Sequence, residues 1–215
     1  MPKKILIFPF GGNARESVVS ILAINEIKRQ WDIIGFLDDN RSVWGKICCG
    51  IKVIGGREMI GRFPDAMILA VQGNPDNYLM RKQIIESLGV DHTRFATIAH
   101  PSVVVASDAN IGTNVLLMPN VFISCGVSVG DHCVVLPNTT VSHDAVIGDY
   151  SCVGSGVSIS GNVNIGSECY IGSGVKVREN IRIGKRSIIG IGSTVISNIE
   201  ERAVAVGSPC RVIRK

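Results

Sequence analysis

Among the four histidines of this 215-residue chain, only His143 is followed by an acidic residue, Asp144. An imidazole exchanges protons near neutral pH, which suits it to general-base chemistry. A carboxylate beside it can fix the tautomer of the ring and stabilise its protonated form. The pair is therefore a candidate for removing a proton from an attacking nucleophile such as an amine. Adjacent strand residues point to opposite faces, so the two side chains cooperate only if they lie at a bend.

A second candidate is the turn PFGGNARE, residues 9–16, which follows a predicted strand and precedes a predicted helix. A dinucleotide fingerprint would place glycines where Pro9 and Ala14 stand, so the turn does not favour NAD. Gly11, Gly12 and the helix N-terminus could still bind a diphosphate through backbone N–H groups.

The third candidate is Asp38-Asp39, at the end of a predicted strand over 31–37. Carboxylates at the carboxyl edge of a strand accept hydrogen bonds from ribose hydroxyls or from a base N–H. The alternative is an ordinary acidic loop.

These residues need elements to position them. The first hundred residues alternate between strand and helix patterns, which predicts a small, mostly parallel α/β sheet. His100-Pro101 marks the expected boundary, giving domains at 1–99 and 100–215. The predicted strands cover 4–8, 31–37, 66–71 and 95–98, and the predicted helices cover 14–29 and 78–88.

The second half carries a six-residue repeat. An aliphatic residue recurs at every sixth position, and a small or β-branched residue follows four positions later. Three such units make a superperiod of eighteen, as three short strands and three turns would in each coil of a parallel β-helix. Glycine is expected where a turn needs a positive φ or a close backbone approach. The aliphatic positions are Val105, Ile111, Leu117, Ile123, Val129, Val135, Val141, Ile147, Val153, Ile159, Ile165, Ile171, Val177, Ile183, Ile189 and Val195, and the periodic glycines are Gly112, Gly130, Gly148, Gly166 and Gly184.

Composition limits the partners. The net charge is only +4 and the basic residues are scattered, which argues against a nucleic-acid surface but suits anionic ligands. No apolar run is long enough for a membrane span, and the N-terminus predicts a first strand rather than a signal peptide. Seven cysteines without a CxxC favour a reducing cytoplasm and no metal site. Cys133 and Cys169 are predicted core residues.

Both halves together resemble the nucleotide-sugar N-acetyltransferases and sialic-acid O-acetyltransferases of the hexapeptide-repeat, left-handed β-helix class. The resemblance extends over nearly the whole chain. The matching stretches are FGGNAR (10–15), FLDD (36–39), AVQGN (70–74), HPS (100–102), VSHDAVIG (141–148), SGNVNIG (160–166) and GSPCRV (207–212). It implies a left-handed β-helix after a Rossmann-like domain.

The resemblance also implies a homotrimer with active sites between adjacent β-helices. The α/β domain would hold a nucleotide-linked sugar, acetyl-CoA would lie along the β-helix seam, and His143 would act as general base beside Asp144. The residues implied to bind the sugar nucleotide are Gly11, Gly12, Asn13, Arg15, Asp38, Asp39, Asn74 and Asn138.

The resemblance also implies acetyl-CoA contacts, of which Gly172, Ser173, Gly190 and Ile191 lie in columns of small residues spaced by eighteen. The implied contacts are Cys152, Gly161, Gly172, Ser173, Gly190 and Ile191. Two positions depart from the family pattern. Cys152 stands where a second histidine is common, and Leu136 stands where an asparagine is common, with Asn138 two residues later.

The expected function is acetyl-CoA-dependent N-acetylation of a nucleotide-linked 4-amino-4,6-dideoxy sugar in bacterial glycan synthesis. O-acetylation of a sugar hydroxyl is the near alternative, and a non-catalytic sugar-binding trimer is a further one. A β-helix carbonic anhydrase would need three zinc histidines, whereas only His132 and His143 lie within the repeat. The sugar and its UDP, GDP or dTDP carrier stay open.

Overall fold

The N-terminal sheet has five strands in the order β3-β4-β2-β1-β5. Four of them pair in parallel, and β3 pairs antiparallel with β4. The predicted strands at 4–8, 31–37 and 66–71 are confirmed, whereas the β3–β4 hairpin was not predicted. The strands are β1 (Lys3–Phe8), β2 (Trp31–Leu37), β3 (Ile47–Cys48), β4 (Ile51–Gly55) and β5 (Met67–Ala70).

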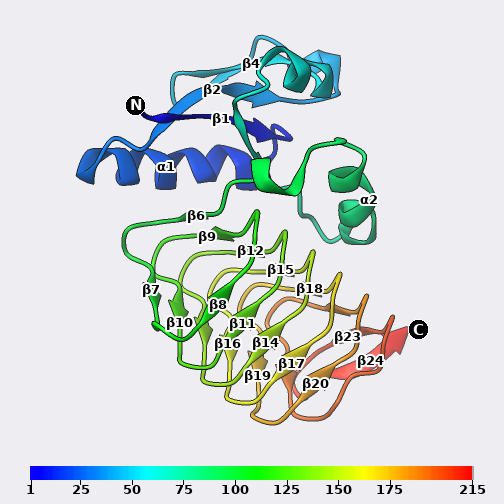
Figure 1. Ribbon diagram of the computed structural model, residues 1–215. Coiled ribbons are helices and arrows are strands. Elements are labelled where there is room, and N and C mark those ends of the chain that lie inside the picture. Colours follow the sequence, from blue (N-terminus) through cyan, green and yellow to red (C-terminus); the bar gives the residue numbers. More distant parts are fainter. Residues whose placement is uncertain (215) are drawn as a thin grey trace.

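Helix α1 (Gly12–Ile27) covers one side of this sheet, between the sheet and the rest of the molecule (Figure 1). It begins directly after Gly11, two residues earlier than the periodicity predicts. The second predicted helix is shorter than expected, because residues 78–80 form a 3-10 turn before α2 (Arg81–Glu86). The other 3-10 turns are η1 (Arg41–Val43), η2 (Arg57–Arg62) and η4 (His92–Arg94), and η3 is Tyr78–Met80.

The computed structural model, which describes residues 1–214, folds the repeat region into a three-faced parallel β-helix (Figure 1). Strands one coil apart pair in register at a spacing of 18 residues, as Phe122 does with Thr140. This is the architecture expected from the sequence.

We number the faces in chain order. Face 1 contains β6 (Ile98–Ala99), β9 (Leu116–Leu117), β12 (Val134–Val135), β15 (Cys152–Val153), β18 (Tyr170–Ile171), β21 (Ile188–Ile189), β23 (Val204–Val206) and β24 (Arg211–Arg214). Face 2 contains β7 (Val104–Val105), β10 (Phe122–Ile123), β13 (Thr140–Val141), β16 (Ser158–Ile159), β19 (Lys176–Val177) and β22 (Thr194–Val195). Face 3 contains β8 (Asn110–Ile111), β11 (Ser128–Val129), β14 (Val146–Ile147), β17 (Asn164–Ile165) and β20 (Arg182–Ile183).

The core of the prism is the predicted aliphatic series. Every member is buried except Val105 and Ile111, which belong to the first coil. Cys133 and Cys169 are buried in the same cluster, as predicted. The strands are therefore held by side chains that stack inward at one position per turn.

The corners between faces use close packing more than glycine flexibility. The periodic glycines approach the next coil so closely that a Cβ on Gly148 would come within 2.5 Å of Ser167 N. The left-handed corner residues are mostly not glycine; His132, Asp144 and Asn162 have φ of 58°, 59° and 58°. The periodic glycines are therefore explained by close backbone approach and not by a positive φ.

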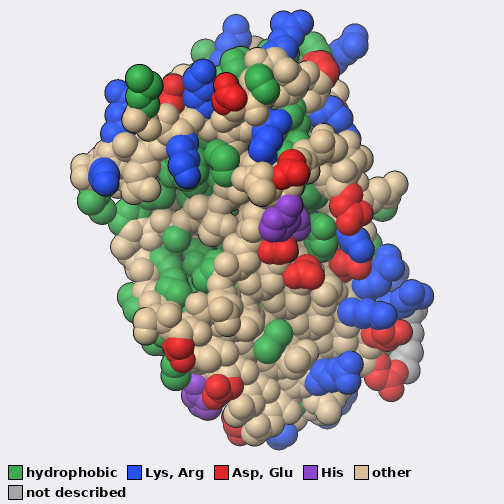
Figure 2. All heavy atoms as spheres, in the orientation of Figure 1, with side chains coloured by type: hydrophobic (Ala, Val, Ile, Leu, Met, Phe, Trp, Pro, Cys, Tyr) green, Lys and Arg blue, Asp and Glu red, His purple; other side chains and the backbone are tan. Residues whose placement is uncertain are grey.

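Face 1 carries the N-terminal unit. Outward-pointing Leu116, Val134 and Cys152 pack in one cluster with β1 and α1 residues. Lys and Arg side chains gather over the N-terminal unit and near the last coils (Figure 2). No helix within residues 1–214 is both long and apolar enough to cross a bilayer.

Candidate active site

His143 and Asp144 occupy the corner where the chain passes from face 2 to face 3, which we call the 2/3 edge. His143 Nδ1 lies 2.9 Å from Asp144 Oδ2. The left-handed φ of Asp144, 59°, turns its side chain toward its neighbour instead of to the opposite face. The bend that cooperation requires is therefore present, and both side chains are more than half exposed.

Gly161 occupies the same corner one coil further along. A Cβ built there would lie 2.5 Å from both Cε1 and Nε2 of His143. The imidazole therefore rests against the Gly161 backbone. In the described chain, Nε2 has no hydrogen-bond partner, so it is the ring nitrogen left for a substrate.

A pocket of about 330 Å³ lies at the glycine turn before α1. Its wall is formed by Gly11, Gly12 and Asn13 on one side and by residues 71–74 and Asn77 on the other. Asn13 Nδ2 donates to Val71 O at 3.1 Å and to Gly73 O at 3.5 Å, which ties the two walls together. Free backbone N–H groups at the start of α1 suit an anionic ligand here.

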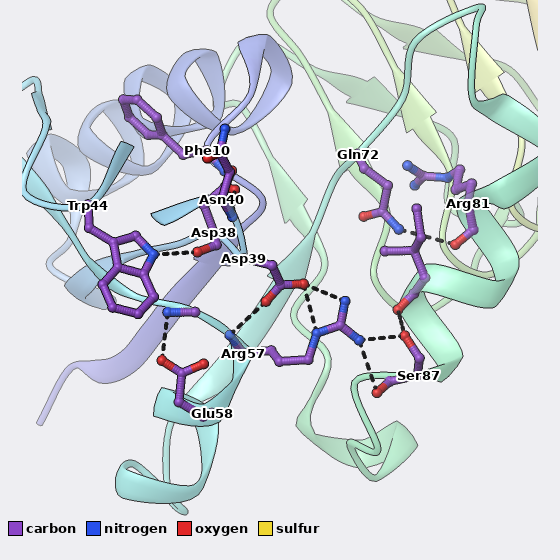
Figure 3. A network of polar contacts seen from close by, with 12 residues as sticks. Phe10, Asp38, Asp39, Asn40, Trp44, Arg57, Glu58, Gln72, Arg81 and Ser87 are labelled. Carbon is purple, nitrogen blue, oxygen red and sulfur yellow. Dashed lines mark hydrogen bonds and ion pairs between the residues drawn. The ribbon is translucent and has the colours of Figure 1, made fainter. Parts of the chain in front are cut away.

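The predicted Asp38 and Asp39 differ in their surroundings (Figure 3). Asp38 accepts hydrogen bonds from the N–H of Phe10 at 3.0 Å and of Asn40 at 2.8 Å. Asp39 forms an ion pair with Arg57, whose hydrogen bond holds the pKa of Asp39 below its usual value. Both oxygens of Asp38 and Oδ1 of Asp39 keep a second lone pair for a ligand, whereas Oδ2 of Asp39 already accepts two hydrogen bonds from Arg57.

Two more predicted sugar-nucleotide residues lie at the same end of the molecule. Arg15 donates to Gly11 O at 3.4 Å and lies over the ring of Phe10. Asn74 lines the pocket and accepts from the N–H of Asp76 at 2.7 Å. Of the predicted residues of the α/β unit, Gly11, Gly12, Asn13 and Asn74 line the pocket, whereas Arg15, Asp38 and Asp39 do not.

Five of the other predicted residues lie on the corner between faces 1 and 2, the 1/2 edge. Asn138 accepts from Asn120 Nδ2 at 3.1 Å, and Ser173 Oγ accepts from the N–H of Ser155 at 3.2 Å. Gly172 and Gly190 also lie there, and Ile191 is 80% exposed. The corner is a strip of small residues ending in one apolar side chain.

Cys152 is on face 1, not on the edge that carries His143. It is buried under Gly73, where an added Cβ would come within 2.6 Å of its Sγ. Burial raises the pKa of its thiol, and nearby Arg81 opposes that shift. Cys152 therefore borders the pocket from below as a neutral thiol.

Within one chain, the candidate residues form two separate groups. The pocket, Cys152 and the 1/2 edge lie on one side of face 2, and His143, Asp144 and Gly161 lie on the other. Face 2 exposes Val104 by 56% and Phe122 by 42%.

The other histidines have structural surroundings. His132 is buried, stacks on Tyr150 at 4.7 Å and lies 3.0 Å from Asn114 Nδ2 through its Nδ1. His92 Nε2 lies 3.2 Å from Asp131 Oδ2. Within residues 1–214, no three His, Cys, Asp or Glu side chains are grouped to hold a metal ion.

Sequence reasoning missed Arg57, Gln72 and Asn77. Arg57 is recruited to Asp39 from η2, and its Nη1 reaches Ser87 Oγ at 2.6 Å. Gln72 and Asn77 line the pocket from the loop after β5. The stretch AVQGN (70–74), which matches the related family, was the sequence feature that could have indicated this loop.

Comparisons with known proteins agree with this fold. A family model described as the GMPPB C-terminal domain matches residues 94–204. No match was found among curated protein sequences.

Three solved structures are similar over nearly their whole length. A mutant perosamine N-acetyltransferase from Caulobacter crescentus, in complex with CoA and GDP-perosamine, is 21% identical, with a TM-score of 0.86 over 100% of this chain and 98% of that one. The acetyltransferase domain of PglB from Neisseria gonorrhoeae is 25% identical, with a TM-score of 0.84 over 98% and 100% of the two chains. WeeI from Acinetobacter baumannii is 23% identical, with a TM-score of 0.81 over 99% and 100%. These likenesses confirm the expected α/β domain followed by a left-handed β-helix.

Proposed function

This chain belongs to the GMPPB C-terminal domain family, and we propose that it transfers an acetyl group from acetyl-CoA to the amino group of a nucleotide-linked sugar. The observation that carries the proposal is the contact between His143 Nδ1 and Asp144 Oδ2 at 2.9 Å, with Nε2 left unpaired in the described chain. The similar structures that hold CoA, acetyl-CoA or GDP-perosamine support the substrate classes.

His143 is the general base in this proposal. Asp144 accepts from Nδ1–H and so keeps Nε2 in its proton-accepting form. As the sugar nitrogen forms a bond to the thioester carbonyl, Nε2 takes the proton from that nitrogen. When the C–S bond breaks, the imidazolium returns the proton to the departing thiolate. A backbone N–H near Gly161 stabilises the oxyanion between these steps.

The pocket at the glycine turn takes the sugar nucleotide. Its diphosphate lies against Gly11, Gly12 and the start of α1, and Asn13 and Asn74 hold the two walls around it. Asp38 and Asp39 accept hydrogen bonds from the nucleoside, with Arg15 close by. A ligand of this length would extend toward the 1/2 edge and Asn138.

Acetyl-CoA lies along the 1/2 edge, where Ile191 is exposed and the backbone of Gly172 and Gly190 packs closely against the next coil. Cys152, which lies under Gly73, borders the acetyl end of the bound acetyl-CoA. His143 is on the far edge of face 2, so this arrangement needs the 2/3 edge of another copy.

A homotrimer supplies that edge. Three copies packed by face 2 around a threefold axis bring each 2/3 edge against the 1/2 edge of the next copy. The exposed Val104 and Phe122 on face 2 support this packing, because apolar side chains gain from burial. All seven cysteines are free thiols, which fits the reducing cytoplasm in which we place the reaction.

The test is an acceptor panel of UDP-, GDP- and dTDP-linked amino sugars with acetyl-CoA, following release of the CoA thiol. One amino sugar should be acetylated, and His143→Ala should abolish the turnover. The control is His92→Ala, an exposed histidine on another side of the molecule, which should retain it. Turnover only with a hydroxyl acceptor would favour O-acetylation, and binding without turnover would favour a non-catalytic trimer.

A further inference from the structure

Cys48 and Cys49 stand next to each other at the tip of the β3–β4 hairpin, with their Sγ atoms 3.9 Å apart. Cys48 pairs with Ile51, so Cys49 and Gly50 form a two-residue hairpin turn. Cys49 is exposed and Cys48 is half-buried. Solvent-borne reagents can therefore reach at least one thiol of the pair.

The conformation of the turn explains why the sulfurs meet. Neighbouring strand residues direct their side chains to opposite faces. Cys49 instead has a φ of 49° and Gly50 a φ of 77°, the two positive values characteristic of a type I′ turn. Such turns favour Asn, Asp or Gly first, and a left-handed cysteine costs roughly 1 kcal/mol.

The hairpin tip and the residue before the glycine turn pack against the same hydrophobic cluster. Cys48 packs in one cluster with Phe10, the residue directly before the Gly11-Gly12 turn. Burial raises the pKa of the Cys48 thiol, and the Arg15 guanidinium acts in the opposite direction. Phe10 and Arg15 are therefore the neighbours through which a change at the hairpin would reach the pocket.

We propose that Cys48 and Cys49 are a reversible redox modification site, at which a peroxide converts the two thiols to a disulfide between adjacent residues. Peroxide first oxidises the exposed Cys49 thiol to a sulfenic acid, with release of one water. The Cys48 thiol then attacks that sulfur, the S–S bond forms and a second water leaves. Two thiols lose two electrons and two protons, and the peroxide is reduced.

The bond should be easy to reverse. Adjacent Cα atoms are about 3.8 Å apart, which is closer than the usual separation of about 4.4–6.8 Å across a disulfide. A strained disulfide of this kind is readily reduced by dithiols. The sulfurs must approach from 3.9 Å to bond, so the hairpin tip changes shape beside the hydrophobic cluster on which Phe10 also packs. Weaker sugar-nucleotide binding follows, and this consequence rests on the proposed function, whereas the modification itself does not.

Tryptic peptide mapping tests the modification directly. Cleavage after Lys46 and Lys52 releases both thiols in the single peptide ICCGIK, residues 47–52. After hydrogen peroxide and then iodoacetamide, this peptide from the full chain should be two hydrogens lighter and unalkylated. Dithiothreitol before iodoacetamide should restore two alkylations. Cys125→Ser, which removes the other exposed thiol, should behave the same, and Cys49→Ser should leave Cys48 alkylated.

Two results would overturn the proposal. One is sulfinic or sulfonic acid at Cys49 without a cross-link, and the other is disulfides that join two chains. Calorimetry with GDP, UDP and dTDP then measures the consequence, and Kd should rise on the order of tenfold on oxidation and recover with dithiothreitol. An unchanged Kd in the cross-linked protein would contradict the proposed effect of the disulfide on nucleotide binding. Absence of binding in the reduced protein contradicts the proposed function, while the peptide result still decides the modification.

Discussion

The imidazole of His143 lies against the backbone of Gly161, which is 18 residues later and occupies the same corner of the next coil. A Cβ at position 161 would lie 2.5 Å from both Cε1 and Nε2 of the ring. The missing side chain therefore makes room for the imidazole. This contact joins two neighbouring coils of the repeat and positions the ring of the proposed general base.

Gly161→Ala should displace the ring and lower kcat by about a hundredfold, as misplacement of a reacting group by about 1 Å can do. The free energy of unfolding should change by less than about 1 kcal/mol, because the imidazole is exposed and can move aside. Gly61→Ala is the matched control, since a Cβ there meets nothing within 4 Å. Steady-state kinetics and urea titration measure both effects. An undiminished kcat in Gly161→Ala would refute the positional argument.

Asp144→Asn tests the carboxylate without disturbing the corner, because asparagine tolerates the left-handed φ of 59°. Loss of the charge removes the partner that fixes the tautomer of His143. The expected fall in kcat is on the order of a hundredfold, smaller than for a buried carboxylate because water screens this pair. KM should change little. A kcat equal to that of the unmodified protein would assign Asp144 to the corner geometry alone.

The β-helix could be predicted because its signal is local and repeated. Each coil places Ile, Val or Leu at the same positions, and each aliphatic needs only the residue one coil away to bury it. The corner position of His143 and Asp144 followed from counting within the same repeat. The side chain of Asp144 reaches His143 because Asp144 has a left-handed φ, and that backbone angle could not be predicted from the sequence.

The surroundings of the α/β residues could not be predicted in the same way. Asp39 accepts a hydrogen bond from Arg57 of η2, which is eighteen residues away in an irregular region. No periodicity in the sequence relates the two residues. Cys152 stays a predicted neighbour of acetyl-CoA, and its place under Gly73 could not be predicted because it depends on how the two halves pack. The β3–β4 hairpin was missed because its first strand has only two residues.

Gly73 and Cys152 offer a test of the pocket floor. Gly73→Ala would bring a Cβ within 2.6 Å of Cys152 Sγ, so the loop should lift and KM for the sugar nucleotide should rise about tenfold. Cys152→Ala removes the obstructing sulfur. The double variant should recover most of the lost affinity, giving a non-additive double-mutant cycle. Additive effects would mean that the two residues do not share the floor.

Stability should depend on pH through His132. Burial lowers the pKa of this imidazole to about 4, with Arg81 and His92 acting in the same direction and Asp131 and Asp149 opposing it. The unfolded chain binds this proton near pH 6.5, so stability is complete above that value and falls by about 2 kcal/mol as pH drops toward 4. Urea titrations at stepwise pH measure the slope.

His132→Asn is the comparison for that slope, because asparagine tolerates the left-handed φ of 58°. The free energy of unfolding of this variant should change less with pH between pH 6.5 and 4. The lowered pKa values of Asp39 and Asp131 act below this window, since each starts from 3.8. An equal slope in both proteins would show that His132 is not the group that titrates.

Subunit complementation tests most directly whether His143 of one copy serves the pocket of the next. His143→Ala lacks the base, and Gly12→Trp fills the pocket, so each protein alone should be inactive. Co-expressed and purified as mixed trimers, the two should regain about a third of the normal turnover, because one of the three seams in each mixed trimer joins an intact base to an intact pocket. Mixed trimers that form but stay inactive would contradict the account.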